Sequence, residues 1–483
     1  MSTIDPTYPP LDAIQEDARP ISQATEKVEI DTPRTLFSAA LAASLLLWVA
    51  MYNGYPTVFS DTGGYLLTGV FQIALAPYRA PGYAFFTSIT SMGASPWFTI
   101  AAQAILVVYV LYETCNYLIG SERKFLDRCL LIGVPALAAL TSLPWLVSLL
   151  MPDLFAGILF LTAFLLVFSG GLPLARRILL ALIVTISIAA HSSLFPIAAL
   201  FFAAVAIMAL AGGQMLGLPS ARSVMPWLLV PIVAAAFWTS AMNYRMGLGF
   251  KLSPSRNAFL LGRLFADGLA GDFLRENCPK EHFISCQYLS HLPRTEEEFL
   301  FQHPLFSDLK TNEDEMDAIV RGTIASYPRR FLLSSARQAF LQLGTLRTGD
   351  EIRTYGAREW NDSVMQLVYP RDLLTFRRDR QIRGRLLPLA DALSTVHTVV
   401  FWISVPACLL FAWTRRFPRI NYFLASAIIF LVINAAVCGA LAGVFDRYQS
   451  RVAWLMPFCL FVYLSGLAVE RNRGVTEQDP ACP

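Results

Sequence analysis

The chain has 483 residues, of which 55% are hydrophobic and 15% charged, and its mean hydropathy is +0.50. Soluble domains carry about 25% charged residues, and the deficit here coincides with recurring apolar runs close to twenty residues long. This composition excludes a cytosolic globular enzyme, a secreted disulfide-rich domain, a collagen and a disordered protein. The net charge of +3 comes without a basic, aromatic-interleaved run, so we expect no nucleic-acid partner. The sequence predicts an all-α polytopic membrane protein.

The first 34 residues are predicted to form a disordered tail on the cytoplasmic side. Acidic residues outnumber basic ones in this segment, and both the basic start and the apolar core of a signal peptide are missing. Lipidation signals are also missing, because position 2 is not glycine and Cys482 is next to last. Residues 471–483 are expected to form a second short cytoplasmic tail.

Windows of about nineteen residues predict ten membrane spans, in an N-terminal module over residues 35–243 and a C-terminal set over residues 391–470. An apolar stretch at 82–95 is a candidate eleventh span, but it is short and rich in Ser, Thr and Gly, which also suits a re-entrant or interfacial helix. The ten expected spans are 35–52, 97–118, 129–150, 154–170, 178–193, 195–213, 226–243, 391–413, 420–443 and 452–470.

Lysines and arginines in the short loops predict the orientation. With the N-terminus inside, the inner loops hold eleven of these residues, whereas the short outer loops hold only Arg79, Arg447 and Arg451. We therefore expect a multi-pass protein of the bacterial inner membrane with both termini in the cytoplasm.

Residues 244–390 form a polar segment that is long enough for a small, mainly helical domain on the periplasmic side. The apolar spacing over 313–346 is typical of a helix, and Pro328 is expected to break or kink it. Cys278 and Cys286 are the only cysteines of this segment. In an oxidising outer compartment they are expected to form a disulfide, while the other six cysteines stay reduced, in agreement with the predicted orientation.

The first outer loop, within residues 53–82, gathers polar residues that suit chemistry. Asp61 lies among Gly and Ser residues, Tyr65 follows one helical turn later, and Arg79 ends an apolar stretch. A carboxylate here can accept a proton from a hydroxyl group or bind a divalent cation. The alternative is structural, with Asp61 capping a helix that begins near Thr62.

Two further outer turns carry candidate residues. Asp153 lies in a very short turn, where it has either a functional role or that of a helix N-cap. His191, at the turn between two spans, can hydrogen-bond a ligand phosphate or orient a carboxylate. Its alternative role is to satisfy polar groups at the membrane interface.

The last outer turn contains Arg447, Tyr448 and Arg451. The two arginines are spaced i, i+4, so in a helix both point to one face and can grip a phosphate or diphosphate group with paired donors. Alternatively they snorkel toward lipid phosphates or pair with Asp446.

In this order, these motifs resemble the GT-C superfamily of polytopic glycosyltransferases, especially its bacterial dolichyl-phosphate-mannose-transferase-like and aminoarabinose-transferase-like branches. The family has an Asp in the first outer loop and an Arg-Pro-like motif that opens the next helix. Residues 60–65 (Ser-Asp-Thr-Gly-Gly-Tyr) and 79–83 (Arg-Ala-Pro-Gly-Tyr) are similar to these motifs. Asp153 matches the second acidic position, and Arg447-Tyr448 matches a late outer Arg-Tyr pair.

The chain departs from the family pattern in two places. Its second outer loop has one acidic residue where many members have a pair, and its large domain interrupts the spans, whereas the family commonly has it at the C-terminal end. The loop around Cys278 and Cys286 also resembles a set of uncharacterised proteobacterial membrane proteins.

The resemblance implies transfer of a sugar from a polyprenyl-phosphate donor to a lipid or glycan acceptor of the cell envelope, among membrane lipids. It implies that Asp61 is the general base, acting alone or with Mg²⁺ or Mn²⁺ held by Asp61 and Asp153, and that Asp153 also positions the acceptor. Substrate binding falls to Tyr65, Arg79, His191, Arg447, Tyr448 and Arg451, with the arginines stabilising the phosphate leaving group.

Two other functions stay open. An O-antigen ligase or polymerase would use an undecaprenyl-diphosphate-linked glycan and place its key residues within 244–390. A transporter or flippase of lipid-linked sugars would place charges at mid-membrane in broken helices. The predicted spans are nearly free of charge, with Asn434 and His397 among the polar residues well inside them, which weighs against ion-coupled transport.

Overall fold

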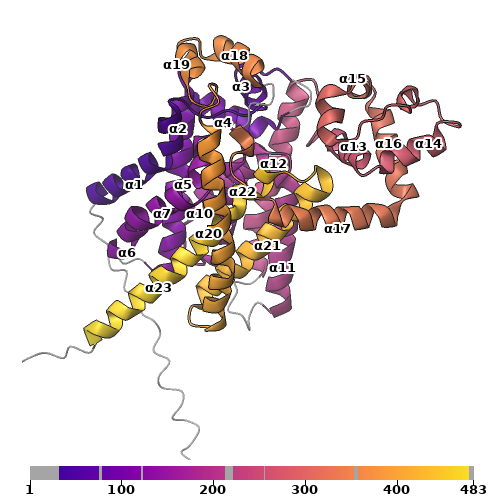
Figure 1. The fold of residues 1–483 in the computed structure, drawn as a ribbon. Coiled ribbons are helices and arrows are strands. Elements are labelled where there is room, and N and C mark those ends of the chain that lie inside the picture. Colours follow the sequence, from indigo (N-terminus) through magenta and orange to yellow (C-terminus); the bar gives the residue numbers. More distant parts are fainter. Residues whose placement is uncertain are drawn as a thin grey trace, which may run out of the picture.

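The computed structural model describes residues 32–74, 79–120, 123–212, 221–254, 256–352 and 357–477. The predicted tail up to residue 31 and residues 478–483 lie outside these ranges. Within them the chain is helical, and the extended backbone pairs in one isolated parallel bridge between Thr57 and Leu149. Figure 1 shows a bundle of helices with a smaller group of helices projecting from one end.

The N-terminal module runs from Thr32 to Arg245. Its helices are α1 (Thr32–Leu46), α2 (Trp48–Asn53), α3 (Thr62–Phe71), α4 (Pro81–Ser91), α5 (Pro96–Ile119), α6 (Arg123–Arg128), the π-helical turn η2 (Cys129–Gly133), α7 (Val134–Leu140), α8 (Leu143–Ser148), α9 (Leu154–Phe168), α10 (Leu174–Ala190), α11 (Leu194–Gly212) and α12 (Ala221–Arg245). The C-terminal set completes the bundle with α20 (Leu387–Trp413), α21 (Pro418–Leu441), α22 (Asp446–Ala453) and α23 (Leu455–Glu477).

Five helical stretches of the described residues are long and apolar enough, by length and composition, to cross a membrane. They are Pro96–Ile119, Val224–Arg245, Leu387–Trp413, Pro418–Leu441 and Asp446–Arg471. Each coincides with an expected span, and the predicted class, an all-α polytopic membrane protein, is confirmed.

Several other expected spans differ from the structure. The stretch 129–150 is divided into η2, α7 and α8, because the helix ends at Thr141 and restarts with Pro144 in the first turn of α8. The first span is interrupted at Leu47, between α1 and α2. The candidate eleventh span at 82–95 corresponds to α4, which has 11 residues and is too short to cross a membrane as a helix.

The bundle is built around α9, whose 15 residues are almost all buried. A helix that is apolar on every side belongs in the interior, because no face of it favours water. The ring of Phe160 lies 5.3 Å from that of Phe430 and 5.9 Å from that of Phe201, while Phe164 contacts Phe423. This aromatic core joins the N-terminal module to α21, so the two sets of expected spans form one bundle.

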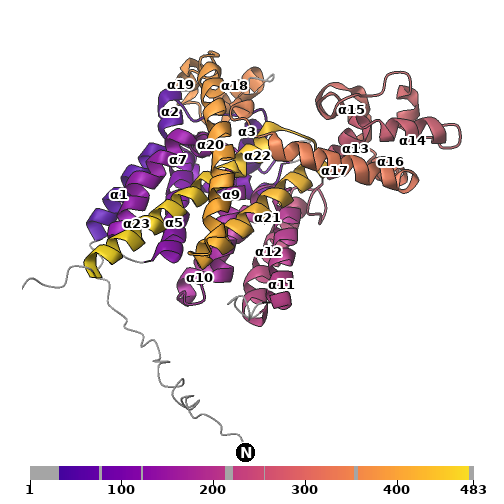
Figure 2. The same cartoon turned by 60° about the horizontal axis from the view of Figure 1, so that its bottom comes forward.

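Residues 256–327 form a helical lobe with a hydrophobic core of its own, which includes Leu261, Phe299 and Ile319 (Figure 2). Its elements are α13 (Arg256–Ala266), α14 (Leu269–Asn277), η3 (Ile284–Tyr288), η4 (Glu298–Gln302), α15 (Pro304–Leu309) and α16 (Glu313–Ser326). The predicted helix over 313–346 is interrupted as expected, because α16 ends at Ser326 and Pro328 opens α17 (Pro328–Gly344).

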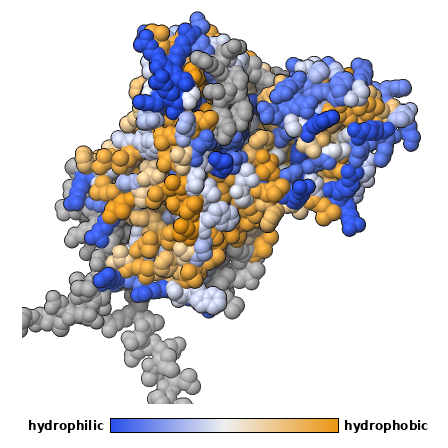
Figure 3. Space-filling view, in the orientation of Figure 1, coloured by the Kyte–Doolittle hydropathy of each residue, from blue (hydrophilic) through white to orange (hydrophobic). Residues whose placement is uncertain are grey.

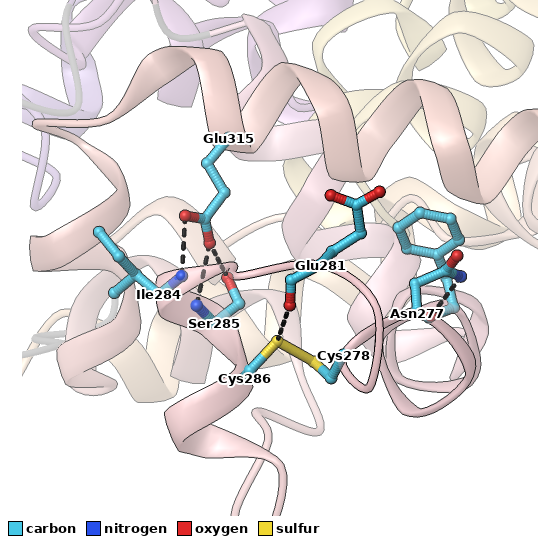
Figure 4. Close-up of a disulfide and its surroundings, with 8 residues drawn as sticks. Asn277, Cys278, Glu281, Ile284, Ser285, Cys286 and Glu315 are labelled. Carbon is cyan, nitrogen blue, oxygen red and sulfur yellow. Dashed lines mark hydrogen bonds between the residues drawn. A yellow bond between two sulfur atoms is a disulfide. The ribbon is translucent and has the colours of Figure 1, made fainter.

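The lobe contains the expected disulfide between Cys278 and Cys286. Figure 4 shows the Glu315 carboxylate of α16 above it, accepting hydrogen bonds from the backbone N–H groups of Ile284 and Ser285, both at 2.9 Å. The Ser285 hydroxyl donates to the same carboxylate at 2.7 Å. The disulfide-bonded loop is thereby fixed to the lobe.

Residues 357–386 form a cap with α18 (Ala357–Val368) and α19 (Leu373–Arg378), which pack on the first interhelical loop rather than on the lobe. Figure 3 shows an apolar surface over the bundle and hydrophilic surfaces on the cap and the lobe. The segment 244–390 therefore contains two separate units instead of the single domain that we expected. We call the end of the bundle that carries them the loop end.

Candidate functional site

Two loops pair at the loop end and position the predicted acidic residues. The backbone N–H of Thr57 donates to Ser148 O, and the N–H of Leu150 donates to Thr57 O, both at 2.9 Å. The hydroxyl of Thr62 also donates to Leu150 O at 3.1 Å. The first loop, which carries Asp61, is thus fixed to the segment that leads to Asp153.

Asp61 lies between two guanidinium groups. Its Oδ1 is 2.6 Å from Arg79 Nη2, and its Oδ2 is 3.9 Å from Arg447 Nη1. All three side chains are largely buried but keep some exposure, between 10% and 16%. The ring of Phe59 packs 4.5 Å from the Arg447 guanidinium and holds it in this position.

The capping role considered for Asp61 is not observed. Asp61 occupies the N-cap position of α3, but its side chain makes no capping hydrogen bond and turns toward Arg79. Gly64, in the first turn of α3, permits this approach, because a Cβ atom there would lie 3.2 Å from Arg79 Cγ. The first turn of α3 therefore serves to bring the carboxylate and the guanidinium together.

His191 lies beside this cluster, in the turn between α10 and α11. Its Nδ1 accepts the backbone N–H of Ser193 at 3.2 Å and lies 2.8 Å from the Ser193 hydroxyl. Burial and the guanidinium groups of Arg451, Arg447 and Arg79 hold the pKa of the imidazole well below its ordinary value. His191 is therefore a neutral imidazole whose proton is on Nε2, where it can serve as a hydrogen-bond donor.

Two tyrosines complete the predicted set. The Tyr65 ring packs edge-on against Tyr83 at 5.3 Å, and burial raises the pKa of Tyr65 above its ordinary value, so that it stays a neutral phenol. Tyr448 lies beneath both arginines of α22, with its ring centroid 5.1 Å from the Arg447 guanidinium and 5.5 Å from that of Arg451.

A cavity of about 650 Å³ lies between the loop end and the lobe. Six of the eight residues predicted for catalysis or substrate binding line it, namely Asp61, Tyr65, Arg79, His191, Arg447 and Tyr448. The lobe contributes charged and polar residues to the opposite wall, namely Asn257, Lys310, Glu313 and Asp317. Phe250, Leu252 and Leu441 also line the cavity and are exposed at the surface, so the cavity reaches the apolar exterior of the bundle.

Asp153 and Arg451 do not line the cavity and form a second, deeper layer. The Arg451 side chain is 0% exposed and that of Asp153 is 2% exposed, with Oδ1 of Asp153 3.7 Å from Nη1 of Arg451. Arg451 also donates to Asn434 Oδ1 at 2.8 Å and to Ser193 Oγ at 3.2 Å. Direct contact of these two residues with a substrate is thus not supported by their position. The expected shared face of Arg447 and Arg451 is divided in the structure, because only Arg447 reaches the cavity.

The structure adds to the site a residue, Glu296, that the sequence does not reveal. Glu296 of the lobe reaches over the backbone at Gly443, where a Cβ atom would lie 2.4 Å from Glu296 Oε2. Burial raises the pKa of Glu296 well above its ordinary value, although Arg447 and Arg263 act in the opposite direction. Arg447 therefore lies in the field of three carboxylates, Asp153 and Asp61 from the bundle and Glu296 from the lobe. No pattern in the sequence distinguishes Glu296 from the neighbouring Glu297 and Glu298.

The cap holds the first loop through two amide side chains that were also not predicted. Asn361 accepts from Gly63 N at 3.0 Å and donates to Phe59 O at 2.9 Å. Gln381 accepts from Val58 N at 2.9 Å and donates to Val58 O at 2.6 Å. Both residues lie about 300 positions from the loop they fix, so only the fold reveals their role.

The expected divalent-cation site does not fit these residues. Asp61 already faces Arg79 and Arg447, and Asp153 faces Arg451, so each carboxylate is next to a group that repels a cation. Among the described residues no group of three or more His, Cys, Asp or Glu side chains is arranged to hold a metal ion. The cluster is better suited to an anion, because two guanidinium groups face one carboxylate across the cavity floor.

Comparison of the chain with protein-family models, curated proteins and solved structures finds no match.

Proposed function

We propose that this protein is a membrane glycosyltransferase that moves a sugar from a polyprenyl-phosphate donor to a hydroxyl group of an envelope lipid or glycan. The observation that carries this proposal is the Asp61 carboxylate between Arg79 and Arg447, on the floor of a cavity that reaches the apolar surface of the bundle. A donor of this class joins a negatively charged phosphate to a long apolar tail, and the cavity offers both environments.

The donor phosphate would bind the two guanidinium groups on the cavity floor. Arg79 and Arg447 are held by Asp61, Phe59 and Tyr448, so little conformational entropy is lost when they bind an anion. The Nε2–H of His191 supplies a further, uncharged donor. The prenyl tail would leave past Phe250, Leu252 and Leu441 toward the lipid.

Asp61 would act as the general base. The acceptor hydroxyl gives its proton to the carboxylate while its oxygen bonds to the anomeric carbon, and the bond between that carbon and the phosphate oxygen breaks. The electron pair of the broken bond stays with the phosphate. Arg79 and Arg447 stabilise the charge that develops on this leaving group, and no step of this scheme uses a metal ion.

The acceptor would approach from the lobe. Lys310 of the lobe and Lys251 of the segment before it are balanced by Glu313 and Asp317 of the lobe, so this wall of the cavity carries no net charge, in contrast to the cationic floor. Lys251 pairs with Glu313 at 2.5 Å. A neutral polar wall suits a hydroxyl-bearing acceptor better than a second phosphate.

The proposed setting is the bacterial inner membrane, with the cavity at the periplasmic face and both termini in the cytoplasm. The Cys278–Cys286 disulfide supports an oxidising environment for the lobe. The turns between α9 and α10 and between α20 and α21, which lie at the end of the bundle away from the lobe in Figures 1 and 2, carry Arg176, Arg177, Arg415 and Arg416, and such a charge bias supports a cytoplasmic position for them.

The test is Asp61→Asn in proteoliposomes supplied with undecaprenyl-phosphate-linked radiolabelled hexose or aminoarabinose and a membrane glycolipid extract. We expect transfer to fall by a factor of about 10² or more, because the base is lost, with expression and thermal stability retained. The matched control is Asp362→Asn, which removes an arginine-paired carboxylate on the cap that lies 2.6 Å from Arg377 and does not line the cavity.

Wild-type activity of Asp61→Asn would contradict the assignment. Transfer by the wild-type protein only from a diphosphate-linked oligosaccharide would favour a ligase or polymerase instead.

A further inference from the structure

Helix α17 differs in direction from the helices of the bundle. It runs from Pro328 to Gly344 and joins the lobe to the bundle, and Figures 1 and 2 show it extending outward across α21 rather than parallel to α20. Its 17 residues form a long, continuous element of the polar segment 244–390. The side of α17 that does not contact the protein must therefore face water, lipid or another molecule.

One side of α17 is occupied by polar contacts with the protein. Ser334 and Ser335 accept hydrogen bonds from Arg263 of the lobe, at 3.2 and 3.0 Å. Gln342 is fully buried, donates to Phe445 O at 2.8 Å and accepts from Phe445 N at 2.9 Å. This side therefore fastens α17 to the lobe and to the loop before α22.

The other side of α17 is uncovered and carries large apolar side chains interspersed with Arg329 and Arg337. Leu332, Leu333 and Phe340 are 66%, 62% and 75% exposed, and Leu341 is 45% exposed. Soluble proteins rarely leave several large apolar side chains together on one short helix without a partner. The side chains therefore indicate contact with an apolar phase or with another molecule.

The position of α17 along the bundle indicates that its exposed side meets an apolar phase and not another molecule. Gly439 lies near the end of α21, and a Cβ atom there would come within 2.6 Å of Gln338 O on α17. Because α21 is long and apolar enough to cross a membrane and ends at Leu441, α17 crosses it where the span ends. That level corresponds to the boundary between the hydrocarbon and the lipid headgroups.

The arginines of α17 also suit a position at the boundary between the hydrocarbon and the lipid headgroups. Arg329 and Arg337 are exposed and have no acidic partner among the described residues, while Arg330 pairs with Asp272 of the lobe at 2.9 Å. Helices that lie in the membrane interface combine a large apolar face with arginines and lysines that meet anionic lipid phosphates.

We propose that α17 is an in-plane membrane anchor of the lobe. Its exposed apolar side chains enter the headgroup boundary of the leaflet at the loop end, and Arg329 and Arg337 bind the phosphates of anionic lipids. The anchor fixes the height of the lobe above the lipid and hence the width of the cavity that lies between the lobe and the bundle. This inference rests on the fold and does not depend on glycosyl transfer.

The test places a nitroxide label at Leu332→Cys or Phe340→Cys in the full-length protein. The protein carries Cys482→Ser and is reconstituted in vesicles of phosphatidylcholine and phosphatidylglycerol; the free cysteines of the described residues are buried. The matched control is Leu367→Cys on α18 of the cap, which is 60% exposed and has the same side chain as Leu332. We expect collisions with oxygen to exceed those with a water-soluble nickel chelate at 332 and 340, and the reverse at 367.

Two results would overturn the proposal. Higher accessibility to the nickel chelate at 332 and 340 would show that α17 is solvated. An immobilised label that neither reagent reaches would show that a protein partner or a second copy of the chain covers it. In addition, Arg329→Gln/Arg337→Gln should lower the preference of the protein for spin-labelled phosphatidylglycerol over phosphatidylcholine by at least twofold, and an unchanged preference would contradict the role of the arginines.

Discussion

The loop end contains two layers of aspartate and arginine that differ mainly in burial. In the upper layer Asp61, Arg79 and Arg447 line the cavity and remain partly exposed. In the lower layer Asp153 and Arg451 are buried, and neither lines the cavity. Arg447 and Arg451 are one turn apart on α22, so a single helical turn separates the two environments.

Arg447 and Arg451 are of the same type and one turn apart, yet they differ in burial. Residue type and spacing therefore do not define the role of an arginine at a membrane interface. A partly exposed guanidinium can exchange its carboxylate for an incoming anion, because solvent and ligand reach it. A fully buried one cannot do so without leaving a charge unpaired, which is very costly in an apolar interior. We therefore propose that the upper layer binds the ligand and that the lower layer holds α9, α21 and α22 in position.

The largest effect is expected from Arg451→Leu. It leaves the buried Asp153 carboxylate without its partner and removes the hydrogen bonds to Asn434 and Ser193. Breaking a buried pair in this way typically costs about 3–5 kcal/mol of the free energy of unfolding. Thermal or denaturant unfolding of the purified protein in detergent measures it.

The double variant Asp153→Leu/Arg451→Leu provides the control for this prediction. It replaces both charges by apolar side chains, and we expect a smaller loss of stability than for Arg451→Leu alone. If the single variant were as stable as the wild type, or the double variant were the worse of the two, the lower layer would not be a structural ion pair.

The second largest effect is expected on phosphate binding by the upper layer. Arg447→Gln should weaken binding of undecaprenyl phosphate by a factor of about 10², because a charge-assisted contact with the phosphate is lost. The loss of stability should be smaller than for Arg451→Leu, since the Arg447 side chain is 10% exposed and that of Arg451 is 0% exposed, and Asp61 keeps Arg79 as a partner. Equilibrium binding and thermal unfolding, measured on the same preparation, separate the two quantities.

Arg377→Gln on the cap is the matched control, since Arg377 pairs with Asp362 outside the cavity. Equal loss of phosphate binding in both variants would mean that overall charge, and not the cavity floor, determines affinity.

Much of the fold can be predicted from local patterns, each of which lies within one continuous segment of the chain. Apolar length is enough to find α5, α12, α20 and α21, and Pro328 marks the start of α17. The division of 129–150 is marked in the sequence by Thr141, Ser142 and Pro144, but the arrangement of its pieces depends on tertiary contacts. Ser148 there receives the N–H groups of Ala50 and Thr57, which lie on segments far away in the chain.

The site was predictable only where its residues interrupt an apolar pattern. Asp61, Arg79, His191 and Arg447 stand out for that reason, and the structure brings them to one cavity. Glu296 does not stand out, because it lies in a polar segment where charged residues are common. The depth of Arg451 was also not predictable, since one turn of helix near a span end can lie on either side of the interface.

A further buried carboxylate, Asp379, sharpens the comparison, because no guanidinium group of the described residues lies within ion-pair distance of it and Arg383 acts on it only from farther away. Asp379 of the cap accepts the backbone N–H of Ile382 at 2.6 Å, and burial raises its pKa to about 7. An unfolded aspartate has a pKa of about 3.9, so between about pH 4 and pH 7 the folded protein keeps a proton that the unfolded chain has lost. The contribution of this group to stability therefore falls as pH rises through that window.

The variant Asp379→Asn should remove this pH dependence. We expect the wild-type protein to lose about 2 kcal/mol more than the variant between pH 5 and pH 8, as measured by thermal unfolding at several pH values. Parallel curves for the two proteins would mean that Asp379 is ionised in the folded state throughout.

The smallest effect is expected at Glu296, which shares Arg447 with Asp61 from the side of the lobe. Because burial raises the pKa of Glu296, part of its population is neutral at the lower end of the accessible pH range, and its charge grows as pH rises. The ionised carboxylate competes with a phosphate for Arg447, so binding of undecaprenyl phosphate should weaken with rising pH beyond what titration of the phosphate itself causes.

The variant Glu296→Gln should remove this extra weakening and bind undecaprenyl phosphate a few times more tightly than the wild type at high pH. Since the phosphate titrates equally in both experiments, the difference between the two binding curves isolates Glu296, and identical curves would show that the lobe does not act on the cavity floor through this residue.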